Sequence, residues 1–156
     1  MDIQKNRNFG KYQSVGGWLY LLCFSLIIGG PLRTLNNLLT SFNEVSPLFE
    51  QFPGLEILVY VDSFLSVTLM IFSVRAGNAL WNVKPNAVKT AKKYFLLFLA
   101  YSAFSSILPF IVGLPSEFMD AMIPEVMKGL VQALIFFGIW YSYLVVSKRV
   151  KGTYVE

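Results

Sequence analysis

The sequence predicts an all-α integral membrane protein, a single transmembrane domain over residues 1–156 that folds as a four-helix bundle. Three observations support this prediction. Hydrophobic residues make up 55% of the chain, and the mean hydropathy is +0.56. Charged residues make up only 14%, against roughly 25% in soluble domains. Four apolar runs each reach the roughly 17–25 residues that a helix needs to cross a bilayer.

The four runs are continuous and do not alternate between apolar and polar residues, which disfavours a transmembrane barrel. Backbone groups inside lipid must pair within their own segment, so each run is expected to be a helix. The expected spans are residues 17–39, 57–74, 94–112 and 129–146. The first resembles a signal peptide because Lys5, Arg7 and Lys11 precede it. It is too long and lacks a small-residue cleavage pattern, so it is expected to remain as an anchor.

Basic residues are concentrated on one side of the expected bundle. Eleven of the thirteen Lys and Arg residues precede the first span, follow the fourth, or lie between the second and third, which leaves Arg33 and Lys128. Six of the nine acids fall in the two opposite loops. Because cytoplasmic loops are the basic ones, both termini are expected to be cytoplasmic.

Both outer loops are short, so there is little room for a soluble catalytic domain. Residues 40–56 contain Pro47, Pro53 and Gly54 and are expected to be irregular. In the second outer loop, Ser116 can cap a short helix whose apolar side chains share one face until Pro124 stops it. Such a helix would lie on the outer membrane surface; the alternative is an ordinary turn.

The segment Gly29–Leu39 interrupts the apolar pattern of the first span. Pro31 lacks an N–H, so it frees the carbonyl of Ile27 and predicts a kink. Small and polar residues around it recur at spacings of three and four and therefore share one helix face. They are Gly29, Arg33, Asn36, Asn37 and Thr40. Such a face is typical of packing against protein.

Arg33 is expected to pair with Asp62, the one acid inside an expected span. Counted from the outer ends at Leu39 and Ile57, each lies about 8–9 Å into the membrane at a rise of 1.5 Å per residue. Ionised side chains in lipid are usually paired or functional. The alternative is that each reaches the outer interface separately. The candidate polar cluster comprises Arg33, Asn36, Asn37, Asp62, Ser66, Lys128 and Gln132, with Ser102, Ser105 and Ser106 nearby on the third span.

Two short stretches carry a family resemblance. GGWL opens the first span and YLVVSKRVKGTYV closes the fourth. The matching residues are Gly16, Gly17, Trp18, Leu19, Ser147, Arg149, Val150, Lys151, Thr153 and Tyr154. Together they resemble the bacterial membrane family of domain of unknown function 2569, in which the last aromatic is Phe. The resemblance implies a small bacterial inner-membrane protein with several helices, and it brings no known activity.

The positive charge of the C-terminal tail does not account for all of its residues. Its cations stop translocation and meet anionic headgroups, but they do not account for the neutral and aromatic residues between them. Docking of the tail against helix ends or a partner is one expectation, and simple interfacial anchoring is the other. The candidate interaction residues are Ser147, Arg149, Lys151, Thr153 and Tyr154.

The residues offer little for catalysis. The chain has no His and a single Cys, and it lacks a phosphate loop, a zinc motif or an activated nucleophile. No enzymatic activity and no cofactor are therefore expected. Nucleic acid is not an expected partner either, because the basic residues flank apolar runs.

The preferred hypothesis is an accessory protein that binds another membrane component, with anionic lipid at its basic segments and a membrane protein or a second copy as partner. One alternative is a small oligomeric transporter or channel that uses Arg33 and Asp62. Another is the binding of a lipid or other amphiphile between the helices.

Overall fold

The computed structural model describes residues 15–113 and 116–154, which contain helices and no strand. The elements are α2 (Trp18–Phe24), the π-helical turn η1 (Ser25–Gly29), α3 (Gly30–Val45), the 3₁₀ turn η2 (Ser46–Leu48), α4 (Pro53–Trp81), α5 (Ala87–Val112), α6 (Ser116–Val146) and α7 (Lys148–Thr153). Four helical stretches are long and apolar enough to cross a membrane. The predicted all-helical membrane fold is confirmed. The cations Lys5, Arg7 and Lys11 lie outside the described residues.

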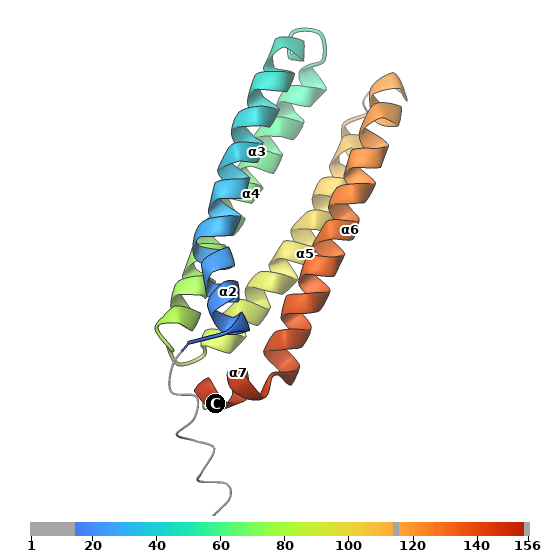
Figure 1. Cartoon of the computed structure of the whole chain (residues 1–156). Coiled ribbons are helices and arrows are strands. Elements are labelled where there is room, and N and C mark those ends of the chain that lie inside the picture. The colour runs from blue at the N-terminus through green and yellow to red at the C-terminus, as the bar shows by residue number, and fades with distance from the viewer. Residues whose placement is uncertain (1–14, 114–115, 155–156) are drawn as a thin grey trace, which may run out of the picture.

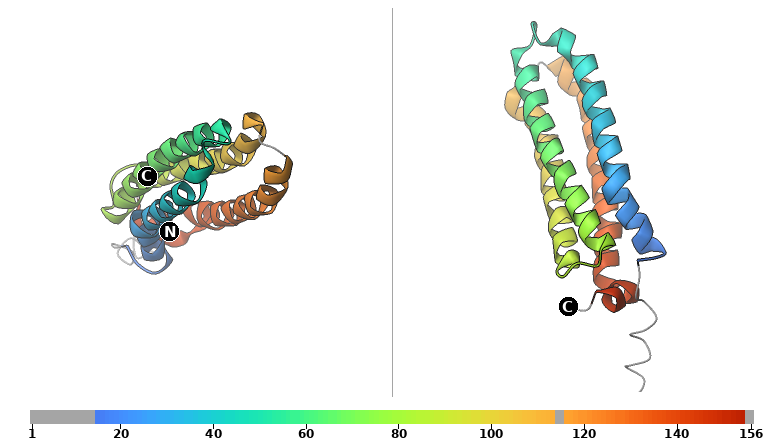
Figure 2. Two further views of the ribbon diagram at one scale, coloured as in Figure 1. Left: turned by 90° about the horizontal axis from the view of Figure 1, so that it is seen from above. Right: turned by 90° about the vertical axis from the view of Figure 1, so that its left-hand side faces the viewer.

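The helices form two hairpins, one of α2, η1 and α3 with α4 and the other of α5 with α6 (Figure 1). We call the end that carries α7 the tail end and the opposite end the loop end. Helix α4 packs against α5 and remains in contact with it as far as Asp62 and Ser105. Helices α3 and α6 diverge toward the loop end (Figure 1). Seen from the side of α3 and α4, the hairpin of α5 and α6 runs behind them along the length of the bundle (Figure 2).

The helices extend well beyond the predicted spans at the loop end. Helix α3 continues to Val45 and α4 begins at Pro53. The prediction of an irregular segment over residues 40–56 was therefore wrong at both ends, and only residues 46–52 form a 3₁₀ turn and a non-helical connection. Pro53 does not disrupt α4 because it occupies the first turn, where the N–H has no helical partner to lose.

The predicted separate surface helix in the second outer loop is also wrong. Helix α6 runs without interruption from Ser116 to Val146 and contains Pro124. A proline at this position removes one helical hydrogen bond, the one to the carbonyl of Asp120. Asp120 is exposed, so water can satisfy that carbonyl. The segment therefore forms the first turns of α6.

The irregularity predicted at Pro31 takes the form of the π turn η1, which ends at Gly29, two residues before the proline. In the π register, the N–H of residue 31 would bond the carbonyl of Leu26. Pro31 has no N–H, and the hydroxyl of Ser73 on α4 donates to that carbonyl at 2.8 Å instead. The hairpin thus satisfies within the protein a backbone group that lipid could not.

The large cluster of buried side chains among the described residues lies at the tail end. Gly77 lets α4 approach η1 closely, since an added Cβ would lie 2.6 Å from Cγ1 of Ile27. The cluster comprises Leu19, Leu22, Cys23, Leu26, Ala76, Leu80, Ala87, Val88, Ala91, Tyr94, Phe95, Trp140, Leu144, Val150 and Tyr154. Toward the loop end, buried apolar residues are few and lie outside this cluster, as Leu55 and Leu108 do.

Candidate functional site

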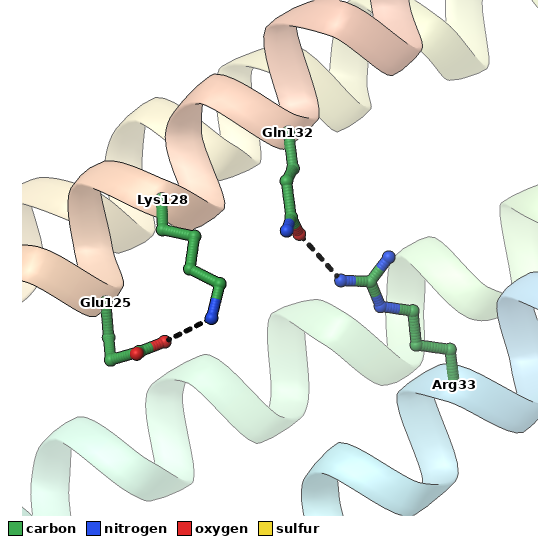
Figure 3. Close-up of polar contacts among 4 residues, drawn as sticks. All are labelled: Arg33, Glu125, Lys128 and Gln132. Carbon is green, nitrogen blue, oxygen red and sulfur yellow. Dashed lines mark hydrogen bonds and ion pairs between the residues drawn. The ribbon is translucent and has the colours of Figure 1, made fainter.

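Arg33 reaches from α3 to α6. Its Nη2 donates a hydrogen bond of 3.1 Å to Oε1 of Gln132 (Figure 3). Both side chains are exposed, and the backbones of α3 and α6 otherwise come close only sparsely. Within residues 15–113 and 116–154, no carboxylate pairs with Arg33. The guanidinium thus meets one neutral amide, and its remaining donors are uncommitted there.

Asp62 does not pair with Arg33, so that prediction was wrong. The carboxylate is half-buried between α4 and α5, where it accepts hydrogen bonds from Ser105 Oγ at 2.6 Å and from Tyr101 at 3.0 Å. Ser66 lies one turn along α4 and donates to the carbonyl of Ser63 at 3.0 Å. Hydroxyl groups, not a cation, therefore hold the carboxylate.

The prediction failed because it counted from helix ends that are not the real ones. Measured from the tail end, Arg33 lies fifteen residues after Trp18, Gln132 lies fourteen before Val146, and Asp62 lies nineteen before Trp81. At a rise of 1.5 Å per residue these are heights of about 22, 21 and 28 Å. Arg33 is level with Gln132, whereas Asp62 lies about one turn nearer the loop end and faces α5.

The remaining members of the predicted polar cluster lie in separate environments. Lys128 pairs with Glu125, one turn away on α6, with 3.6 Å between Nζ and Oε2 (Figure 3). Both side chains are largely exposed, so this ion pair contributes little stability. Asn36 and Asn37 are exposed on α3. The sequence pattern did not identify Tyr101, although its spacing of four from Ser105 places both on one face of α5.

At the other end of the bundle, the C-terminal tail docks against the helices. The hydroxyl of Ser147 accepts a hydrogen bond from the backbone N–H of Val150 at 3.4 Å and so caps α7. Val150, Thr153 and Tyr154 are buried, and the Tyr154 hydroxyl donates to the carbonyl of Leu80 at 2.5 Å. This is the docking alternative of the two expectations for the tail.

The two stretches that carried the family resemblance meet in space at this end. A Cβ added to Gly16 would lie 2.6 Å from Nη2 of Arg149, and one added to Gly17 would lie 3.0 Å from Nη1. Gly17 also has a φ of +58°, a conformation that glycine adopts without strain. The ring of Trp18, which follows, lies 6.4 Å from that of Trp140. The two glycines leave the space that the Arg149 guanidinium occupies.

Residues 12–155 match the family model described as a protein of unknown function (DUF2569). The chain belongs to the DUF2569 family. The match includes both GGWL and the tail, so the contact between Gly16 and Arg149 joins the two ends of the family region. No curated protein and no solved structure matches the chain.

In this DUF2569 protein, the exposed polar groups of the loop-end half are suited to binding. Arg33 offers hydrogen-bond donors and a fixed positive charge, while Gln132 offers an amide. Guanidinium groups bind carboxylate or phosphate through two parallel hydrogen bonds. In the described part of the chain, no three His, Cys, Asp or Glu side chains come together as a metal site would require.

Proposed function

We propose that this DUF2569 protein is an accessory membrane protein, without catalytic activity, that binds a transmembrane segment of another membrane protein between its two hairpins. The proposed location is the bacterial inner membrane. The distribution of Lys and Arg favours cytoplasmic termini, which makes the tail end cytoplasmic and the loop end external. The observation that carries the proposal is the environment of Arg33.

Arg33 is a permanent cation deep in a membrane-spanning helix, about 22 Å from the tail end. Its partner among the described residues is the neutral amide of Gln132. A charge within lipid costs several kcal/mol unless an opposite charge or water compensates it. A carboxylate on a bound transmembrane segment would supply that charge and would engage the fork of donors that Gln132 leaves available.

The packing around Arg33 supports the same proposal. Helices α3 and α6 diverge toward the loop end (Figure 1), and their backbones come close only sparsely. Gly129, one turn from Gln132 on α6, has open space where a Cβ would stand, with no atom within 4 Å beyond its own stretch of helix. Transmembrane helices associate through close packing at small residues and through hydrogen bonds between polar ones. The facing surfaces of α3 and α6 provide both features for an additional helix.

The proposal can be tested by photo-cross-linking in cells. A photoreactive amino acid at residue 129 is expected to capture a membrane protein whose cross-linked segment contains Asp or Glu. The control is the same group at residue 64, because Phe64 is 73% exposed and lies about 200° around α4 from Asp62, away from α5.

Capture from residue 129 is expected to fall at least tenfold in Arg33→Gln and to fall less in Arg33→Lys, which retains the charge without the fork of donors. Three outcomes would overturn the proposal: equal capture from residue 64, capture that Arg33→Gln leaves unchanged, or cross-links to lipid alone. The last outcome would favour the hypothesis that an amphiphile binds between the hairpins.

Transport is a second candidate, and Asp62 favours it. Its carboxylate is held by the hydroxyls of Tyr101 and Ser105 in a membrane-spanning region, an arrangement that can bind a proton or a cation. Proton or cation flux through proteoliposomes that is abolished by Asp62→Asn and unaffected by Arg33→Gln would support it. Flux no greater than in protein-free vesicles would exclude it.

A further inference from the structure

A hollow of about 240 Å³ lies at the tail end between α5, α6 and the docked α7. Its lining includes apolar side chains from all three helices together with two lysines and a tyrosine. The lining residues are Val88, Lys92, Leu144, Val145, Val150, Lys151 and Tyr154. The hollow depends on the tail, because three of these residues belong to α7 or directly follow it.

The charge around this hollow is of one sign. Eight basic residues lie at the tail end: Arg75, Lys84, Lys89, Lys92, Lys93, Lys148, Arg149 and Lys151. The described segments 15–43, 63–113 and 126–154 contain no Asp or Glu. Lys92 and Lys151 therefore have no acidic side chain of the described tail end to neutralise them, and an anion is the complementary ligand.

The position of the hollow identifies the source of that anion. Val88 and Lys92 lie in the first two turns of α5, and Leu144 and Val145 in the last turn of α6. Both segments are ends of membrane-spanning helices, where phospholipid headgroups lie. A surface that combines two ammonium groups with aliphatic side chains matches a phosphate joined to a glycerol and the start of its acyl chains.

We propose that the hollow is a specific site for an anionic phospholipid, with Lys92 and Lys151 on the phosphate and Val88, Leu144 and Val145 along the glycerol and upper acyl chains. A lysine near an anionic surface contributes about a fivefold gain in affinity, so the two together are expected to contribute about 25-fold. The site is independent of Arg33 and of the proposed partner, which lie in the other half of the bundle.

Native mass spectrometry of the full chain in detergent can test this site. Phosphatidylglycerol and phosphatidylcholine with identical acyl chains are titrated separately, and inorganic phosphate is added as a competitor. The expected result is one phosphatidylglycerol retained in preference to phosphatidylcholine, with no displacement by phosphate at millimolar concentration. Equal retention of the two lipids would contradict the proposal, and displacement by phosphate would assign the site to a soluble anion.

Variants distinguish binding of the lipid in the hollow from its general electrostatic attraction to the basic surface. Lys92→Gln/Lys151→Gln is expected to weaken phosphatidylglycerol binding by at least tenfold, and Lys84→Gln/Lys93→Gln, which removes the same charge outside the hollow, by less than threefold. Val145→Trp fills the hollow without changing charge and is expected to abolish binding. Equal losses in the two double variants, or full binding by Val145→Trp, would overturn the proposal.

Discussion

The tail end and the loop end of the bundle are organised differently. At the tail end, α2, α4, α5, α6 and the docked α7 all contribute to one buried cluster. Arg149 and Tyr154 fix the tail against Gly16 and the carbonyl of Leu80. Toward the loop end, α3 and α6 diverge, and Arg33 and Gln132 face each other as exposed groups. The comparison suggests that one end maintains the fold and leaves the other free to bind.

The largest expected contrast comes from truncating a phenylalanine at each end. Phe95 is fully buried at the tail end, whereas Phe110 is 56% exposed near the loop end. Phe95→Ala is expected to destabilise the protein by about 3–5 kcal/mol because it leaves a cavity. Phe110→Ala is expected to cost less than about 1 kcal/mol because lipid or detergent can fill the space. Reversible unfolding in mixed micelles would measure both, and equal losses would contradict the proposed division.

Adding a methyl group to a glycine should act with opposite sign at two positions. Gly77→Ala forces a Cβ against Ile27 and Leu26, and the expected cost is about 1–3 kcal/mol from overpacking. Gly138→Ala meets no atom within 4 Å and is expected to stabilise α6 by up to about 1 kcal/mol through helix propensity. The same unfolding measurement applies. Stability unchanged by Gly77→Ala would show that α4 and η1 can move apart without cost.

Removing the Tyr154 hydroxyl tests the docking of the tail. Tyr154→Phe loses the hydrogen bond to the Leu80 carbonyl, at an expected cost of about 0.5–1.5 kcal/mol. Tyr143→Phe is the control and is expected to leave stability unchanged. Equal effects of the two substitutions would argue against a specific docking contact.

The contribution of Tyr154 to the stability of the protein should also depend on pH. Burial raises the pKa of the Tyr154 phenol, so above about pH 10, the ordinary tyrosine value, the unfolded chain releases this proton before the folded one does. The resulting contribution to stability is complete below pH 10 and is lost as the pH rises toward the folded-state pKa. The decline between pH 10 and 11 is expected to be steeper in the wild type than in Tyr154→Phe. Parallel declines would contradict the burial of this hydroxyl.

The smallest coupling is expected between Arg33 and Asp62, the pair that the sequence predicted to interact. Arg33 and Asp62 share no partner, so the effects of Arg33→Leu and Asp62→Leu on unfolding should add within about 0.5 kcal/mol. The matched cycle of Asp62→Leu with Tyr101→Phe should show a larger coupling because those side chains are hydrogen-bonded. Strong coupling between Arg33 and Asp62 would show that the two side chains form an ion pair after all.

The sequence determined the fold more fully than the site. Hydropathy located four spans because the length of apolar helix that lipid requires is nearly fixed, and Pro31 correctly marked an irregularity. Helix ends outside lipid carry no such constraint, so Val45 and Pro53 were missed as boundaries. An error of several residues at a helix end shifts the estimated height of a side chain by about a turn. The predicted partner of Arg33 was therefore wrong. The expected packing of its polar helix face against protein was also wrong, because Arg33, Asn36 and Asn37 are exposed and α3 has no buried residue.

The contact between Gly16 and Arg149 could not be predicted from the sequence, for a different reason. Residues far apart in the chain meet according to how the helices pack, and a single sequence carries no information about that register. The close approach becomes apparent only when α7 lies across the helix ends.

The most direct test of the central claim is Gln132→Glu, which gives Arg33 a carboxylate of its own. The substitution keeps the length of the side chain that already lies 3.1 Å from Nη2. If Arg33 serves to recognise an acidic transmembrane segment, this variant should unfold at a temperature no lower than the wild type and should lose capture of the partner from residue 129. Undiminished capture by a stable Gln132→Glu protein would contradict the account.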